Sequence, residues 1–215
     1  MTDRPILFSA PMILALRNGW KTQTRRVLNP QPELRGRFWH WAHGAWSDGC
    51  DPQMLPGHSM HAKMKAHEGD RLWVRETLRF DWTSIIDGWR YDADKTLVKS
   101  VAGKTLETPT PTRWPLGGCV SIFMPRWASR LTLTITDVRV QRLQDISEED
   151  AQAEGIGEPY LGDADPPFEE QAITVSRRKQ FRNLWNILHG PDAWELNPWV
   201  VALTFSVNQS NIDAP

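Results

Sequence analysis

The chain has 215 residues, which suits one domain with insertions or at most two small domains. Hydrophobic residues make up 40% of it and charged residues 24%, so the composition excludes a wholly disordered chain. The formal net charge of −1 excludes a uniformly basic nucleic-acid coat protein, although it is compatible with a local basic patch.

The sequence carries no signal for membrane insertion or export. No apolar run approaches the ~18 residues that a membrane-spanning helix needs. The N-terminal segment contains Asp3 and lacks the ending of a cleaved signal peptide. Two cysteines, Cys50 and Cys119, are too few for a disulfide framework. We therefore expect a cytoplasmic protein without a membrane partner.

Periodic patterns predict the first elements in chain order. A helix is expected over 11–18, because Met12, Ile13 and Leu16 lie at helical spacing and Gly19 follows the end. Alternating or apolar runs predict strands over 21–27, 71–77, 129–143 and 198–207.

The third of these strands changes its apolar face near Asp137. Two helices follow it. Ser147 caps the first, which ends near Gly155, and residues 176–188 form an amphipathic helix.

Long segments of weak periodicity separate these elements, and we interpret them as insertions over about 30–68, 80–118 and 157–174. Asp87-Gly88 predicts a hairpin turn within the second. The predicted fold class is mainly β with helices (α+β), as a mostly antiparallel β-barrel in a single domain over 1–215.

Charge and tryptophan are distributed unevenly. Residues 1–37 are basic and residues 141–170 are acidic, which suggests an anionic ligand at the first segment or, alternatively, two ordinary solvated faces. There are 12 tryptophans, enough for both a core and a stacking surface for bases. The patterns assign Trp73, Trp185 and Trp199 to the core, and leave Trp39, Trp41 and Trp46 for contact or loop packing.

The segment from Gly19 to Arg26 is the most informative motif. A glycine that leaves a helix is followed by Lys21, Thr24 and two arginines, a combination that suits phosphate or a base edge. The alternative is a polar edge strand.

Gly19, Lys21 and Arg26 also match the signature of the ASCH domains of the PUA-like superfamily, and the chain resembles their phage and prophage group. This resemblance implies a small β-barrel with a cleft that binds RNA or a modified nucleoside. The segments that carry the resemblance are 5–12, 69–77, 124–130 and 197–200.

The site resembles that of the small ASCH enzymes that remove acetate from N4-acetylcytidine. The resemblance implies Lys21, Thr24 and Glu154 as catalytic residues and Arg26 as a substrate-binding residue. Thr24 would attack, a desolvated Lys21 would take the proton, and Glu154 would orient Lys21. Because Lys21 and Thr24 lie three residues apart, a turn or bulge must bring them to one side. The alternative is a structural ion-pair network of Lys21, Arg26 and Glu154.

Further candidates lie elsewhere in the chain. Arg126 and Arg130 bracket Trp127, a grouping that could hold a phosphate and a stacked base or else be solvated around a capping indole. Glu76 is expected to point inward, as a substrate-binding residue or as an internal ion-pair partner of Arg26 or Arg75. No cofactor is predicted.

Five histidines and Cys50 fall within residues 40–67, but their spacing matches no standard zinc module. We therefore predict a solvated loop rather than a metal site. The histidines are His40, His43, His58, His61 and His67.

Taken together, these features predict recognition of RNA or a modified nucleoside, with amide hydrolysis on an N4-acylated cytosine as the enzymatic form. The competing class is a non-catalytic RNA-binding phage regulator, in which Lys21 pairs with phosphate. A ribonuclease is the weaker alternative. No oligomeric state follows from the sequence.

Overall fold

The computed structural model describes residues 3–36, 38–41, 44–46, 52–53, 66–81, 88–98, 106, 118–157 and 176–214. The chain folds as two compact units. Unit 1 comprises Met1–Gly19, Gly69–Thr134 and Ser206–Pro215, and unit 2 comprises Trp20–Glu68 and Ile135–Phe205.

Strands make up most of the regular structure in both units, with few helices, so the predicted mainly β class with helices is confirmed. Unit 1 contains β1 (Asp3–Leu7), α1 (Ala10–Arg17), β6 (Arg71–Arg75), β7 (Leu78–Asp81), β8 (Gly88–Tyr91), β9 (Gly118–Cys119), η4 (Ser121–Phe123) and η5 (Arg126–Ala128). Unit 2 contains β2 (Gln23–Val27), β3 (Glu33–Arg35), β4 (Phe38–Trp41), β5 (Gly44–Trp46), η6 (Leu143–Asp145), α2 (Glu148–Ala153) and α4 (Arg177–His189). Two long strands, β10 (Thr132–Arg142) and β11 (Trp199–Asn208), have residues in both.

In unit 1, β6 is central to the pairing. It lies parallel to β1, with Pro5 opposite Trp73, and antiparallel to the start of β10, where Thr132 is also opposite Trp73. A second sheet has the order β8-β7-β9. The predicted hairpin is present, with Asp81 of β7 opposite Gly88 of β8, and the residues between them, Asp87 included, lie outside the described residues.

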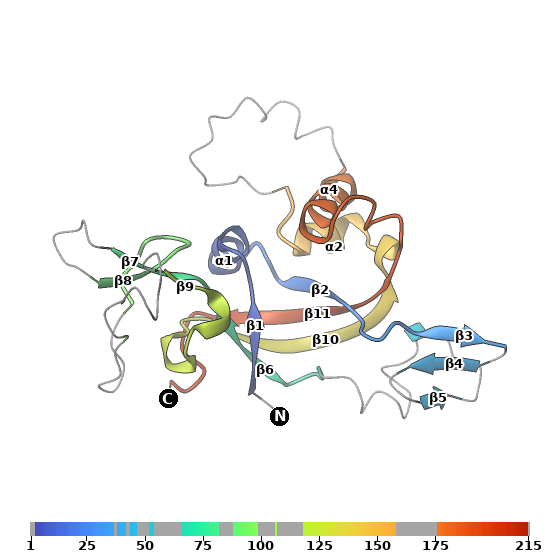
Figure 1. Ribbon diagram of the computed structural model, residues 1–215, viewed down its shortest axis with the longest axis horizontal. Coiled ribbons are helices and arrows are strands. Elements are labelled where there is room, and N and C mark those ends of the chain that lie inside the picture. The colour runs from blue at the N-terminus through green and yellow to red at the C-terminus, as the bar shows by residue number, and fades with distance from the viewer. Residues whose placement is uncertain are drawn as a thin grey trace. The chain divides into compact units, whose positions relative to one another are not determined.

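In unit 2, the strand order is β10-β11-β2, and β11 is antiparallel to β2 with Leu203 opposite Thr24 (Figure 1). Within this part of the described chain β2 is an edge strand, and no closed barrel is found among the described strands. The expected barrel therefore stays a prediction, since β2 has a paired strand on one side only among the described strands.

Part of the segment expected to be irregular is a sheet. Strands β3, β4 and β5 form an antiparallel three-stranded sheet in this order, in which Leu34 lies opposite Trp39. The aromatic residues of β4 favour strand structure, and Gly36 has the positive φ of 66° that a turn between β3 and β4 uses. The 157–174 insertion lies outside the described residues after 157.

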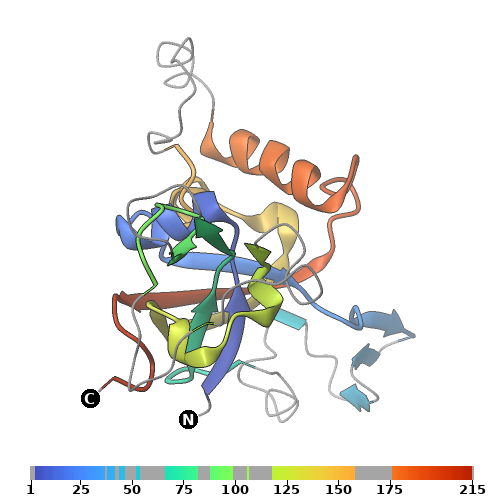
Figure 2. The same ribbon diagram turned by 60° about the vertical axis from the view of Figure 1, so that its left-hand side comes forward.

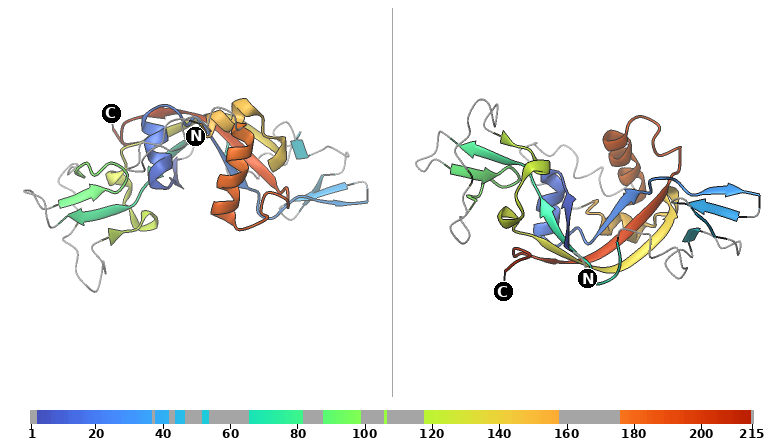
Figure 3. Two further views of the ribbon diagram at one scale, coloured as in Figure 1. Left: turned by 90° about the horizontal axis from the view of Figure 1, so that it is seen from above. Right: turned by 60° about the horizontal axis from the view of Figure 1, so that its bottom comes forward.

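The helix signals in the sequence are confirmed in unit 2. The Ser147 hydroxyl accepts a hydrogen bond from the Asp150 amide at 3.0 Å, and the Ser176 hydroxyl accepts one from Lys179 at 3.3 Å. Helix α2 ends at Glu154 as its C-cap, followed by Gly155 with φ 88°. Helices α2 and α4 lie next to each other near β2 (Figures 2 and 3).

The core of unit 2 lies under α4. Phe181 and Trp185 are buried, as predicted from their helical spacing, and the Phe181 ring lies 5.9 Å from the Trp185 ring and 6.3 Å from that of Trp194. Leu143, Ile146, Ala151, Ala193 and Val200 complete this cluster. Trp199 and, in unit 1, Trp73 are buried as predicted, and Trp41 is buried too.

The core of unit 1 gathers Leu78, Trp89, Tyr91, Cys119 and Met124. Burial raises the pKa of the Cys119 thiol to about 11, so this cysteine is protonated and inert at neutral pH. No helix in the described residues combines the length and apolar character that crossing a bilayer requires.

Replacing Trp185 by Ala is expected to lower the free energy of unfolding by about 3–5 kcal/mol, because it removes a buried aromatic side chain and leaves a cavity. Ile187→Ala on the same helix is the control, since Ile187 is 80% exposed and its loss is expected to cost less than about 0.5 kcal/mol. Urea unfolding of both variants measures the difference. Equal effects would show that α4 does not cover the core through Trp185.

Candidate functional site

The centre of the candidate site is an ion pair within unit 2. The Lys21 ammonium donates to Oε2 of Glu154 at 2.6 Å and to the backbone carbonyl of Glu154 at 2.9 Å. The two residues also form an isolated antiparallel bridge through their backbones. Two side chains 133 residues apart in the sequence are thus fixed to each other.

Local structure explains why these residues meet. The last carbonyls of α2 have no partner within the helix, and the chain before β2 supplies donors for them. The Thr22 amide donates to the Ala153 carbonyl at 2.8 Å, and Lys21 bonds the next carbonyl. A cation at a helix C-terminus is also electrostatically favourable.

The pair is removed from solvent. Lys21 is 1% exposed and Glu154 is 8% exposed. Burial lowers the pKa of Lys21 because it penalises the ammonium, and Glu154 only partly opposes this by attraction and hydrogen bonding. Repulsion from Arg26 and Arg25 lowers the Lys21 pKa further. The predicted desolvated lysine is therefore present in the structure.

The second cation at Glu154 is Arg25, which the sequence analysis did not single out. Its Nη1 donates to Oε1 of Glu154 at 3.1 Å and to the Gln23 amide oxygen at 2.6 Å, and its Nη2 donates to Asp150 at 2.6 Å. Alternation along β2 places Lys21, Gln23 and Arg25 on one face, and this spacing was the available signal.

Asp150 lies one helical turn before Glu154 on α2 and collects further donors. Arg139 donates to it at 2.9 Å, and the Gln23 amide at 3.3 Å. Burial raises the pKa of Asp150, but the hydrogen bond from Arg139 and the charges of Arg25 and Arg139 outweigh this, so its pKa is lowered. Asp150 therefore stays ionised at neutral pH.

The remaining two residues of the predicted site are less tightly joined to the pair. Thr24 is buried in β2, on the strand face opposite to Gln23 and Arg25 by alternation. The hydrogen bonds from Lys21 and Arg25 to the Glu154 carboxylate do not involve the Thr24 hydroxyl. Burial lowers the pKa of Arg26 and the Glu154 charge raises it, so Arg26 lies within electrostatic reach of the carboxylate.

Glu76 and Arg130 form a separate cluster in unit 1. Glu76 is 2% exposed, and Arg130 grips it with two hydrogen bonds, from Nε at 2.8 Å and from Nη2 at 2.7 Å. Its partner is thus Arg130 rather than Arg26 or Arg75. Arg130 also donates to Asp94 at 2.8 Å and lies 3.8 Å from the Tyr91 ring centroid. Most donors of Arg130 are therefore used inside the protein.

Tyr91 and Arg17 extend this cluster. Burial raises the pKa of Tyr91 to about 12, and its hydroxyl donates to the Ala128 carbonyl at 2.7 Å. Arg17 pairs with Asp94, and burial, with repulsion from Arg130, lowers the Arg17 pKa.

The other two predicted substrate-binding residues also lie in unit 1. Arg126 donates to Asp213 and Asp3, both at 2.6 Å, and these bonds raise its pKa. Trp127 is half-buried and packs against the core of unit 1. Binding roles for both stay predictions.

Within the described residues, no group of three or more His, Cys, Asp or Glu side chains is placed to hold a metal ion. Only His40 and His67 of the histidine-rich segment belong to these residues, and Cys50, His43, His58 and His61 lie outside them. The interpretation of that segment stays a prediction.

The chain has no recognised relative in the comparisons. No family model matches it, and no significant match was found among curated proteins or solved structures. The chemistry of the site therefore has to be argued from the side chains themselves.

Glu154→Gln is expected to lower the free energy of unfolding by about 3 kcal/mol at neutral pH, because it leaves the buried Lys21 without its anion. The loss should shrink as the pH rises through the lowered pKa of Lys21 in the folded wild type, because the amine then becomes neutral and no longer needs the Glu154 anion. Chemical unfolding at several pH values measures both effects.

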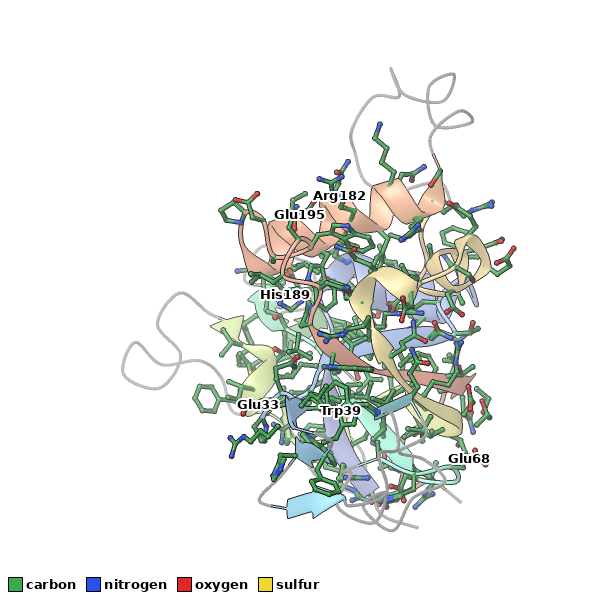
Figure 4. All side chains as sticks on the ribbon, turned by 90° about the vertical axis from the view of Figure 1, so that its right-hand side faces the viewer. Glu33, Trp39, Glu68, Arg182, His189 and Glu195 are labelled. Carbon is green, nitrogen blue, oxygen red and sulfur yellow. The ribbon has the colours of Figure 1, made fainter. Side chains whose placement is uncertain are left out.

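The matched control is Glu33→Gln in the β3 part of unit 2, where Glu33 is labelled in Figure 4. It forms an ion pair with Arg35, and both side chains are exposed, Glu33 to 61% and Arg35 to 66%. The expected cost is below about 0.5 kcal/mol. A Glu154 effect as small as that of Glu33 would contradict a buried, coupled ion pair.

Proposed function

We propose that the chain is an ASCH-type protein of the PUA-like superfamily that recognises RNA or a modified nucleoside and hydrolyses the N4-acyl amide of N4-acetylcytidine-type substrates. The observation that carries the proposal is the buried pair of Lys21 and Glu154, joined at 2.6 Å. A lysine whose pKa burial lowers is suited to act as a base near neutral pH.

In the proposed reaction, Lys21 first accepts a proton and later donates it. Lys21, as the neutral amine, takes the proton of the Thr24 hydroxyl as its oxygen attacks the acyl carbon. Arg26 stabilises the oxyanion of the tetrahedral intermediate. The C–N bond then breaks, the proton passes from Lys21 to the departing N4 amine, and water hydrolyses the acyl-threonine to release acetate and free Thr24.

Glu154 orients Lys21 in this scheme. Its carboxylate holds the amine at a fixed position and stabilises the ammonium formed after proton transfer, so the pair serves in both protonation states. Because the Thr24 hydroxyl does not belong to the hydrogen-bonded cluster, substrate binding has to bring it and Lys21 to the same acyl group. Variants of Thr24 are therefore the most direct test of the proposed reaction.

Turnover of N4-acetylcytidine tests the proposal. Lys21→Met, Thr24→Val and Glu154→Gln are each expected to reduce kcat/KM at least about 100-fold, since each keeps the side-chain volume and removes the base, the nucleophile or the group that orients the base. Thr24→Ser should retain turnover because it keeps the hydroxyl. Release of acetate measures the rate.

The control for lysine chemistry in general is Lys95→Met, since the Lys95 side chain is 68% exposed in unit 1. It should leave turnover unchanged. Wild-type protein without turnover above background, or three variants as active as wild type, would overturn the hydrolase proposal.

A second candidate function, a non-catalytic RNA-binding regulator, draws support from α4. This helix contains four cations and no acidic residue. Arg178, Lys179 and Arg182 are exposed. Arg182 lies beside Glu195 (Figure 4), and the two pair at 2.8 Å across an exposed face, which leaves Lys179 the better placed to meet phosphate.

RNA binding is tested by titrating a single-stranded oligonucleotide at several salt concentrations. Affinity should fall as salt rises, because phosphate contacts release counterions. Lys179→Gln together with Arg182→Gln should reduce the slope of log Kd against log salt by about 1, while Arg35→Gln on β3 should not. An unchanged slope would remove α4 as an RNA surface, and shortening of the oligonucleotide that Lys21→Met abolishes would indicate a ribonuclease.

A further inference from the structure

Arg25 joins the two carboxylates that α2 presents to β2. Its side chain is 0% exposed, and its two terminal nitrogens divide between Asp150 and Glu154, at 2.6 Å and 3.1 Å. Asp150 and Glu154 lie four residues apart, one turn of the helix, and so lie on the same face of α2. The Arg25 guanidinium therefore holds both carboxylates on this face of α2.

Only an arginine fits this arrangement. Its planar fork carries several donors in fixed directions, whereas a lysine offers a single point charge that cannot reach two carboxylates one turn apart. Arg25 bonds Oε1 of Glu154, and Lys21 bonds Oε2 at 2.6 Å. The carboxylate is thus held from both sides, and its rotation about the terminal bond is blocked.

We propose that Arg25 is a positioning residue of the Lys21–Glu154 pair, which holds the Glu154 carboxylate toward Lys21 by clamping it together with Asp150. This proposal adds to the proposed hydrolase function. Only its turnover experiment depends on that function. Arg25 acts through Glu154 and does not itself meet the acyl group.

The clamp has an electrostatic consequence for Lys21. Charged groups that act on its amine include Glu154 from α2 and Arg25 and Arg26 from β2. Asp150 and Arg139 lie beyond Arg25, and the charge of Arg26 in turn acts on His189 of α4. Removing Arg25 frees the Glu154 carboxylate to turn away from Lys21, which weakens the attraction and the hydrogen bond that raise the Lys21 pKa. This loss outweighs the loss of the weaker repulsion from Arg25, so the pKa of Lys21 should fall.

The decisive variant is Arg25→Met. It leaves Glu154 with Lys21 and Asp150 with Arg139, so neither carboxylate is left without a cation. NMR titration of protein labelled at the lysine side chains, with Lys21 assigned through Lys21→Met, follows the amine directly. The midpoint of Lys21 is expected to move downward by about 1 pH unit or more, because the loosened Glu154 carboxylate stabilises the ammonium less.

Arg139→Met is the matched control. Arg139 bonds Asp150 but not Glu154 among its described partners, so the Lys21 midpoint should stay at its wild-type value. An unchanged or raised midpoint in a folded Arg25→Met variant, or an equal shift in Arg139→Met, would overturn the proposal. If Arg25→Met does not fold, Arg25→Lys replaces it, since it keeps the charge but loses the two-pronged clamp, and the proposal then requires a midpoint below that of wild type.

Turnover separates this proposal from the function proposed above. If wild type hydrolyses N4-acetylcytidine, the pH–rate profile of Arg25→Met should shift downward in step with the Lys21 midpoint, since the base must be neutral. If wild type shows no turnover, the hydrolase proposal fails, while the NMR midpoint still decides the role of Arg25.

Discussion

The Glu154 carboxylate, buried between the Lys21 ammonium and the Arg25 guanidinium, is the constraint on which the rest of the candidate site depends. Charges cost much free energy to remove from water, and they are tolerated here because each meets an opposite charge and further hydrogen bonds. Lys21 also bonds the backbone carbonyl of Glu154, and the Thr22 amide bonds that of Ala153, so the end of α2 is tied to the residues just before β2. The site is therefore part of what joins α2 to the start of β2.

The same interaction has a chemical side. Burial that penalises the Lys21 ammonium lowers its pKa, and two neighbouring arginines act in the same direction. The buried arrangement of charges that joins α2 to β2 thus also lowers the pKa of Lys21. This is why removal of Glu154 is expected to affect both stability and turnover, whereas Thr24, which lies outside the hydrogen bonds, is expected to affect turnover.

Unit 1 contains a second buried charge cluster with a different balance. Glu76 and Asp94 face Arg130, and the guanidinium stacks on Tyr91. The donors of Arg130 are used within the cluster, which favours a structural role for it over direct binding of phosphate. Lys21 differs, because in the proposed reaction it acts by accepting and returning a proton and not by donating a hydrogen bond to a ligand.

Sequence patterns by themselves determined the helices with their serine caps, the long strands β10 and β11, and the burial of Phe181, Trp185 and Glu76. These follow from local periodicity and capping, which act over a few residues. Only the tertiary structure decided which charges meet. The assignment of Arg25 rather than Arg26 to Glu154, and of Arg130 to Glu76, depends on strand register and on where a helix ends against a strand. Such pairings join residues 54 to 133 positions apart, and no local pattern encodes them.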